Sequence, residues 1–131
     1  GKAEIVLVGV SRSMKTPVML YLAYRGWFAA NVPIILETEV PQNLLSLPSE
    51  KVFYLDISPS YLLKLRLTRA RSTGIPEETY ANMVYIQKEL RYARHLSDRY
   101  GWRAVSVAGK SVEEVAAEIL LLKSPRDKTV E

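Results

Sequence analysis

The sequence predicts an α/β domain with three layers and a mostly parallel sheet of about four strands. Short apolar runs alternate along the chain with longer segments of helical character, and connections through helices make neighbouring strands parallel. The run VFYL at 52–55 is continuously apolar, which is typical of a strand buried on both faces of a parallel sheet. Ligands of such domains bind beyond the carboxyl ends of the strands.

The first half of the chain supplies three of the predicted strands. The first begins at Glu4 and ends at Gly9, and a helix follows from Lys15 to Arg25, where Gly26 ends it. The apolar run 27–36 contains Pro33, so we expect the second strand to end between residues 32 and 35. One or two helical turns at 41–47 then precede the third strand at 51–57.

The second half adds three helices and one strand. Ser58 and Pro59 supply an N-cap and a first-turn proline for a helix that runs to about Arg71. A longer amphipathic helix is expected to open at Pro76. Its apolar residues recur at three- and four-residue steps: Met83, Ile86, Leu90, Ala93, Leu96 and Tyr100. After it we expect a strand at 102–107, a helix at 111–122 with a Ser-x-x-Glu capping box, and a tail at 123–131.

Length and composition restrict the function. The 131 residues suit one domain, so we expect a single domain over 1–131. The sequence has no cysteine and one histidine, which excludes thiolate metal sites and makes a Ser-His-Asp triad a poor candidate. The net charge of +4 favours an anionic ligand, but no pattern of a nucleic-acid-binding motif is present. No run reaches the roughly 20 apolar residues of a membrane span.

A candidate phosphate loop follows the first strand. The general pattern is Gly, four residues, Gly, Lys and Ser or Thr; Gly9, Lys15 and Thr16 fit it, and Met14 occupies the second glycine position. Backbone N–H groups and the helix dipole at such a turn favour an anion. We therefore predict that the loop binds phosphate through Gly9, Val10, Ser11, Arg12, Ser13, Met14, Lys15 and Thr16. The alternative is a glycine turn followed by Ser and Thr helix caps, with Lys15 merely solvated.

Three further side chains join Lys15 as candidate catalytic residues. Asp56 ends an apolar strand and could share a Mg²⁺ ion with Thr16, or it could simply begin the turn at Ser58. Arg66 and Arg69 lie three residues apart on one helix face, with Arg71 close by, and could stabilise a phosphoryl group in transit. A solvated helix face is the other interpretation of these arginines.

Other charged residues favour less specific roles. Glu37 and Glu39 follow the second strand and could position a substrate hydroxyl, although a solvated loop is the favoured interpretation. A basic stripe on the long helix is expected to be solvated or to dock a protein: Lys88, Arg91, His95 and Arg99. Because Arg91 and Arg99 lie one turn from His95, we do not expect this histidine to act as a base.

Over nearly its whole length the chain resembles the regulatory proteins of pyruvate, phosphate dikinase and phosphoenolpyruvate synthase. The segments that carry the resemblance are GVSRSMKTP, YLAYRG, NVPI, KVFYLDISPSYLLKLRLTRAR, YANMVYIQKELRYARHL, GWRAVSV and SVEEVAAEIL. The chain departs from the family pattern at Met14 and at Ser106, where aspartate is usual. Asp56 also stands where an uncharged residue is expected, so the resemblance adds nothing to its magnesium role.

The resemblance implies a bifunctional enzyme with a P-loop kinase-like fold that acts on another protein. Such enzymes transfer phosphate from ADP to a threonine of the target and remove it with inorganic phosphate, releasing pyrophosphate. It thus implies ADP or ATP, phosphate and Mg²⁺ as ligands, the dikinase or synthase as partner, and the bacterial cytoplasm or plastid stroma as location. Gly9, Ser11, Arg12, Lys15 and Thr16 would hold the phosphates, and a homodimer stays open.

Family members are roughly twice as long, so the resemblance also implies that this chain matches their carboxy-terminal, nucleotide-binding part. Two alternatives remain at this point. One is a small-molecule P-loop kinase similar to nucleotide and shikimate kinases. The other is a catalytically silent module that binds a nucleotide or a partner protein.

Overall fold

The sheet has four parallel strands. A computed structural model of the chain describes residues 3–36, 38–73 and 82–123, apart from the side chains of 69–73. The strands are β1 (Ile5–Gly9), β2 (Ala29–Pro33), β3 (Val52–Asp56) and β4 (Arg103–Ser106). They are arranged in the order β2-β1-β3-β4, and each neighbouring pair is parallel. The predicted fold class is therefore confirmed.

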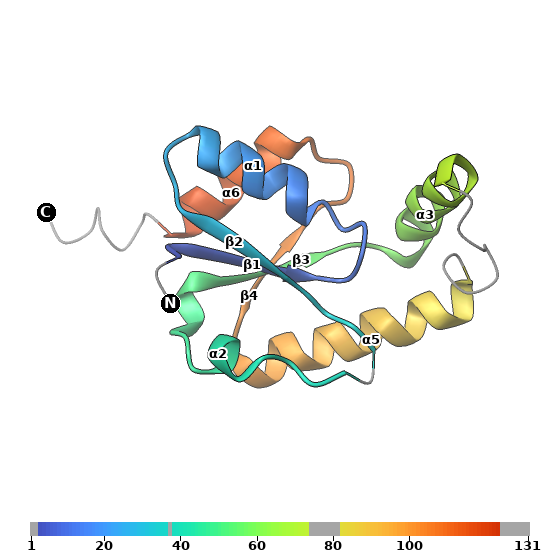
Figure 1. Cartoon of the computed structure of the whole chain (residues 1–131), viewed down its shortest axis with the longest axis horizontal. Helices are drawn as coiled ribbons and strands as arrows, with labels where there is room; N and C mark the ends of the chain where they lie inside the picture. Colours follow the sequence, from blue (N-terminus) through green and yellow to red (C-terminus); the bar gives the residue numbers. More distant parts are fainter. Residues whose placement is uncertain (1–2, 37, 74–81, 124–131) are drawn as a thin grey trace, which may run out of the picture.

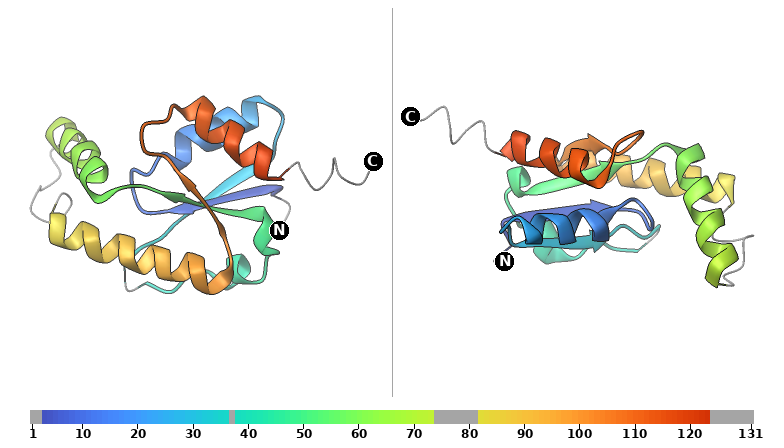
Figure 2. Two further views of the ribbon diagram at one scale, coloured as in Figure 1. Left: turned by 180° about the vertical axis from the view of Figure 1, so that it is seen from behind. Right: turned by 90° about the horizontal axis from the view of Figure 1, so that it is seen from above.

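Helices complete three layers around this sheet (Figure 1). Helices α1 (Lys15–Tyr24) and α6 (Val112–Lys123) pack side by side on one face, and α2 (Gln42–Leu45) and α5 (Met83–Tyr100) lie on the other. Helix α3 (Pro59–Thr73) stands beyond the carboxyl ends of the strands and packs against α5 (Figure 2). A short 3₁₀ turn, η1 (Ser49–Lys51), leads into β3. Helix α3 therefore forms a wall at the edge of the sheet where ligands are expected.

The core follows from the position of each strand. Every residue of the central strand β1 is buried, and in β3 all but the last are buried. The edge strand β2 is half-buried, so Pro33 at its end removes no interior hydrogen bond. Helices contribute apolar residues to both faces of the sheet: Val18, Leu22, Ile86, Leu90, Ala93, Val115, Ala116 and Ile119.

The described ends of α6 and α5 confirm one predicted helix cap and add one that was not predicted. Glu114 accepts a hydrogen bond from the Ser111 amide at 2.8 Å, and the Glu114 amide donates to Ser111 Oγ at 3.1 Å, so the capping box of α6 is present. Helix α5 begins at Met83, because the side chain of Asn82 caps it by accepting from the Tyr85 amide. The expected opening at Pro76 lies outside the described residues, as does the tail after Lys123.

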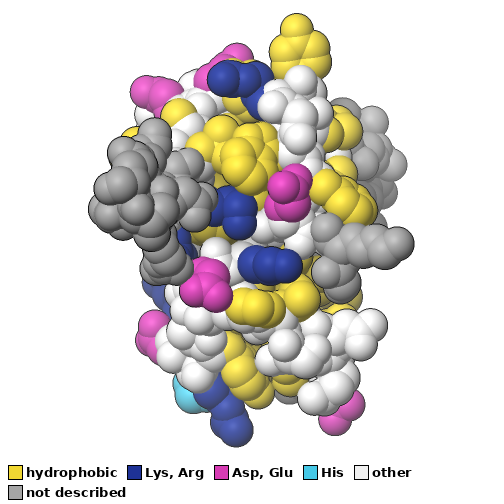
Figure 3. Space-filling model, turned by 90° about the vertical axis from the view of Figure 1, so that its left-hand side faces the viewer, with side chains coloured by type: hydrophobic (Ala, Val, Ile, Leu, Met, Phe, Trp, Pro, Cys, Tyr) yellow, Lys and Arg dark blue, Asp and Glu magenta, His cyan; other side chains and the backbone are white. Residues whose placement is uncertain are grey.

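The strand order places the loop after β1 at a topological switch point. The chain leaves β1 toward β2 on one side and returns to β3 on the other side, which leaves a crevice at the carboxyl ends of β1 and β3. Figure 3 shows the opposite end, where hydrophobic side chains lie among charged ones. Within the described ranges, no helix has the length and apolar character to cross a membrane.

Candidate functional site

The loop between β1 and α1 has an unusual backbone. Arg12 and Met14 both adopt left-handed conformations, with φ of 70° and 75°. Met14 is also the N-cap of α1, and its side chain makes no capping hydrogen bond. A left-handed conformation costs a residue with a side chain about 1–2 kcal/mol, which explains why the general motif has glycine here. Such turns direct backbone N–H groups into a concave surface that suits an anion.

Lys15 is held against this loop. Its side chain is buried, and Nζ donates to the Val10 carbonyl at 2.8 Å; Ser13 Oγ donates to the same carbonyl at 2.7 Å. Burial, and then the charge of Arg66, lower the pKa of Lys15 to about 8. Lys15 is therefore not the solvated side chain of the alternative interpretation, and its charge is available at neutral pH for an anionic ligand.

Gly9 is needed for close packing. A Cβ atom at this position would lie 2.7 Å from Ser13 Oγ and 3.4 Å from the Leu55 carbonyl oxygen. The first contact is far below van der Waals distance, and Ser13 is completely buried. The glycine therefore lets the loop fold back over the end of β3.

A cavity of about 620 Å³ opens beside the loop. Strand β2, helix α3 and the start of α6 supply the other walls. The lining residues are Ser11, Arg12, Met14, Lys15, Thr16, Pro17, Asn31, Pro33, Tyr61, Leu65 and Val112. Its charged lining residues, Arg12 and Lys15, are both cationic. Met14 forms part of the wall and leaves the cavity open, so the arrangement can accept an anion.

Six of these lining residues were not predicted as site residues from the sequence. Pro17 directly follows the loop, and the other five come from three separate elements: Asn31, Pro33, Tyr61, Leu65 and Val112. No local pattern marks them, because only the sheet order and the packing of α3 bring them to the loop.

Arg66 does not line this cavity. It is buried between α3 and α5, where its guanidinium pairs with Glu89 and donates to the Ser11 carbonyl. The side chains of Arg69 and Arg71 lie outside the described residues. Glu89 was not singled out in the sequence, although it stands three residues after Ile86 and four before Ala93, on the apolar side of an amphipathic helix.

Of the two candidate magnesium ligands, Thr16 lines the cavity and Asp56 does not. The Asp56 carboxylate accepts from Arg94 Nε at 2.9 Å and is not among the cavity-lining residues. Thr16 is exposed and lines the cavity, where its hydroxyl could ligate a magnesium ion brought by phosphates. Glu39 lines a separate small hollow of about 170 Å³ beside β2, and Glu37 lies outside the described residues.

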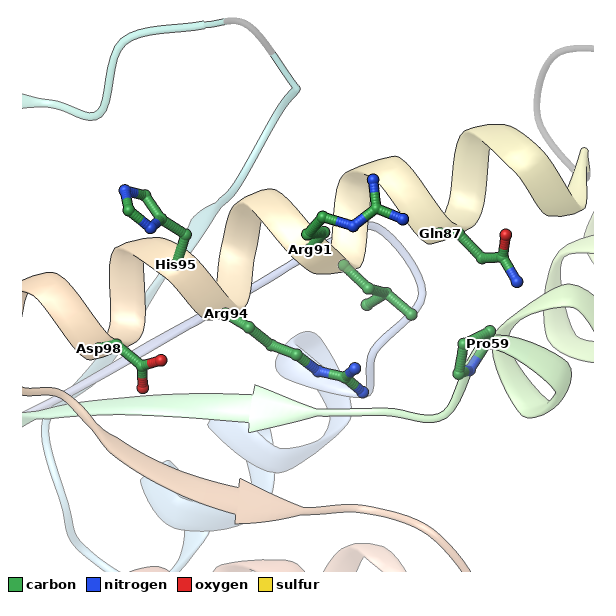
Figure 4. A pocket seen from close by; sticks show the side chains of 7 residues that line it. Pro59, Gln87, Arg91, Arg94, His95 and Asp98 are labelled. Atoms are coloured by element: carbon green, nitrogen blue, oxygen red, sulfur yellow. The ribbon is translucent and has the colours of Figure 1, made fainter.

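The basic stripe of α5 borders a second, open hollow of about 520 Å³ (Figure 4). Arg91 and His95 line it together with Arg94, Asp98, Gln87, Leu90 and Pro59. Lys88 and Arg99 are exposed but lie outside it. The stripe therefore keeps both interpretations, a solvated face or a docking face for a protein.

Comparison with known proteins shows which protein family this chain matches. The model of the family described as "Kinase/pyrophosphorylase" matches residues 1–120. The chain belongs to this family. Relatives named "Putative pyruvate, phosphate dikinase regulatory protein" come from Desulfitobacterium hafniense strain DSM 10664 / DCB-2, 42% identical over 119 residues, and from Carboxydothermus hydrogenoformans, 42% identical over 120. The "Pyruvate, phosphate dikinase regulatory protein, chloroplastic" of Zea mays is 41% identical over 122 residues.

The alignments cover most of this chain and a smaller part of each relative. They include 90–91% of the chain, but 44%, 43% and 29% of the Desulfitobacterium, Carboxydothermus and Zea mays proteins. The chain thus spans less than half the length of these relatives. The predicted resemblance is confirmed, and the chain is a member of the kinase/pyrophosphorylase family.

Proposed function

We propose that this chain carries the nucleotide- and phosphate-binding part of an ADP-dependent serine/threonine kinase. The same site would serve a phosphate-dependent, pyrophosphate-releasing dephosphorylase, and the target would be pyruvate, phosphate dikinase or phosphoenolpyruvate synthase. The relatives' names support this target class. The observation that carries the proposal is the buried Lys15 under a loop whose cavity has only cationic charges among its described lining residues.

Both reactions would use one polyphosphate site. In the forward direction the threonine oxygen attacks the terminal phosphorus of ADP, AMP leaves, and the hydroxyl proton passes to a base. In the reverse direction an oxygen of inorganic phosphate attacks the phosphothreonine phosphorus, the threonine oxygen leaves and takes up a proton, and pyrophosphate forms. Each reaction places two linked phosphates in the same position, which a lysine and a row of backbone N–H groups can stabilise.

The chain's residues would divide the work. Lys15 and the loop amides would bind the phosphates, and Arg12 would add a second positive charge at the cavity mouth. Thr16 would ligate Mg²⁺ held by the phosphates, which supplies charge neutralisation in the transition state. Asp56 remains a proposed magnesium or catalytic residue, and its Arg94 contact would have to loosen for that role. Arg69 remains a proposed catalytic residue. The bacterial cytoplasm or the plastid stroma is the proposed compartment.

Calorimetry on the chain tests the site. We expect ADP to bind and Lys15→Met to weaken binding more than about tenfold, because a buried charge-assisted contact is lost. The matched control is Lys64→Met, which removes an exposed lysine of α3 and should leave the affinity unchanged. Equal affinity of all three proteins, or no binding by any, would refute the phosphate site and favour a silent module.

The target is tested by product analysis. The chain is incubated with ADP, Mg²⁺ and purified dikinase or synthase, and the proteins are analysed by mass spectrometry. We expect phosphothreonine on the target, with AMP in solution, and its loss with release of pyrophosphate when phosphate is added. Phosphate on a metabolite instead of on protein would support the small-molecule kinase.

A further inference from the structure

An ion pair inside the protein joins the two helices at the carboxyl edge of the sheet. Arg66 of α3 is 1% exposed and Glu89 of α5 is 7% exposed. Two hydrogen bonds connect them, from Nη1 to Oε1 at 2.5 Å and from Nη2 to Oε2 at 3.2 Å. This bidentate geometry holds the guanidinium plane in one orientation.

The same guanidinium also contacts the phosphate loop. Nε and Nη2 of Arg66 donate to the Ser11 carbonyl oxygen at 3.4 Å and 3.2 Å. Ser11 is 55 residues away in the sequence and lines the nucleotide cavity, whereas Arg66 does not. Arg66 therefore acts on the loop from behind, through one carbonyl group.

Stability alone does not explain this pair. Removing two charges from water is costly, and apolar residues of similar volume at such positions are often as stabilising. Leucine or methionine at these positions could also pack α3 against α5. Neither side chain could donate to the Ser11 carbonyl as Arg66 does.

We infer that Arg66 and Glu89 are positioning residues that hold the phosphate loop in its anion-binding conformation through the Ser11 carbonyl. This inference deepens the proposed function and rests on it. It also gives Arg66, expected from the sequence to be catalytic, a role through another group rather than on the reacting phosphate.

The planar peptide bond explains how the contact acts. In a trans peptide the carbonyl and the following N–H point in opposite directions, so a Ser11 carbonyl fixed toward Arg66 directs the Arg12 N–H away from it. Arg12 and Met14 are left-handed, and the Met14 side chain makes no capping hydrogen bond at the helix end of this turn. If the peptide rotated, its oxygen would face the phosphates and repel them. The pair keeps donors, not acceptors, directed at the ligand.

The Glu89 carboxylate orients the Arg66 guanidinium toward the Ser11 carbonyl. Without the carboxylate, the arginine would be a buried and uncompensated charge and would turn away from Ser11 to seek water. We therefore expect substitution of either residue to weaken phosphate binding, although neither touches the cavity.

The test separates positioning from stability with a double variant. Arg66→Met/Glu89→Met removes both charges and keeps the packing volume, so the midpoint of thermal unfolding should stay within about 5 °C of wild type. Its affinity for ADP, measured by calorimetry, should fall about tenfold, because the Ser11 carbonyl has lost the two hydrogen bonds from Arg66. Glu118→Gln breaks the Lys110–Glu118 pair, neither member of which lines the cavity. It is the matched control and should bind ADP as wild type does.

If the double variant does not fold, the Arg66→Lys variant provides a second test of the positioning role. It keeps the charge beside Glu89 but replaces the planar guanidinium fork by a single nitrogen on a shorter side chain, so the contact with Ser11 should be weakened. We therefore expect a weaker affinity for ADP at a near-native unfolding midpoint. Wild-type affinity in either folded variant would overturn the inference while leaving the proposed function intact.

Hydrogen exchange gives a readout that does not depend on the ligand. Amides of residues 10–16 should exchange several-fold faster in the double variant than in wild type, whereas those of β3 should be unchanged. If wild type shows no ADP binding that depends on Lys15, the proposed function fails, and unchanged exchange in the loop would then refute the positioning role by itself.

Discussion

At the scale of single residues, the phosphate loop depends on small groups in close contact. Gly9 leaves room for the buried Ser13 hydroxyl, and that hydroxyl and Lys15 Nζ share the Val10 carbonyl. Met14 accepts a left-handed backbone that the motif usually gives to glycine. The loop therefore accommodates the methionine at some cost in stability, whereas a Cβ atom at Gly9 would have to displace the Ser13 hydroxyl.

Gly9→Ala should weaken ADP binding as well as stability. The new Cβ would displace Ser13 Oγ and disturb the loop, so we expect a loss of about 1–3 kcal/mol in unfolding free energy and at least a tenfold weaker affinity. Gly26→Ala is the control, since Gly26 has φ of 93° and open space around it. It should cost a similar 1–2 kcal/mol, roughly, by backbone strain without changing ADP affinity. Chemical denaturation and calorimetry measure both; equal ADP affinity of the two variants would contradict the role given to Gly9.

The pKa of Lys15 predicts how ADP binding depends on pH. Its pKa is lowered to about 8, first by burial and then by Arg66, so it is cationic below pH 8 and loses its charge above it. ADP affinity should fall above about pH 8, by up to roughly tenfold per pH unit. The slope should be absent in Lys15→Met, and a slope that persists there would assign it to another group.

The lowered pKa of Lys15 also predicts how the free energy of unfolding changes with pH. Between pH 8 and the ordinary lysine value of 10.5, the unfolded chain binds more protons than the folded one, so burial of Lys15 costs stability at neutral pH and less as pH rises. At pH 7 the Lys15→Met variant should therefore bind ADP more weakly than wild type but have a higher free energy of unfolding. This pattern is expected of a buried charge that is kept for function.

At the scale of elements, the caps of the helices fix the position of residues that line the cavity. Ser111 and Glu114 start α6 with a capping box, which fixes the neighbouring Val112 at the cavity wall. The pKa of Glu114 is lowered by hydrogen bonds from the Ser111 amide and side chain. This contribution is present when the carboxylate is ionised and is lost as pH falls through its folded pKa.

Ser111→Ala should lower the unfolding free energy by about 1 kcal/mol, because the Glu114 amide loses its acceptor. The exposed Ser60 in the first turn of α3 supplies the control substitution, Ser60→Ala, which should change stability by less than about 0.5 kcal/mol. Urea unfolding of the two variants checks this. A cost no greater than that of the control would show that the capping box contributes nothing measurable.

At the scale of the whole molecule, one continuous core joins the sheet to helices of both layers. The phosphate loop, the β2 end and the α3 wall meet only because the strand order brings them to one edge. A ligand there contacts several elements at once, so its binding energy should stabilise the whole chain rather than one segment.

We therefore expect a single thermal unfolding transition that ADP moves upward. At about 100 times the dissociation constant the gain is about 2.7 kcal/mol, which corresponds to a shift of roughly 5–15 °C for a domain of this size. Adenosine, which lacks phosphates, should give little shift. Scanning calorimetry checks this, and two separate transitions would contradict the expectation of a single domain over 1–131.

Much of the fold was predictable from local signals. The apolar runs gave β1 and β3, Pro33 marked the end of an edge strand, and Ser111 with Glu114 gave the start of α6. The loop from Gly9 to Thr16 was also recognisable, because its residue types are needed locally for a tight turn before a helix. The start of α5 was less predictable, since an asparagine cap at Asn82 competes with the Pro76 signal.

The amino-acid sequence by itself thus determined the layer architecture, the tight turn between β1 and α1 and the family, because periodicity, turn residues and a short motif are local properties. Only the tertiary structure decided that Lys15 is buried, that Asp56 pairs with Arg94, and that Arg66 and Glu89 hold Ser11 from behind. These contacts join residues 23 to 55 positions apart. Their existence depends on strand order and helix packing, which no single stretch of sequence encodes.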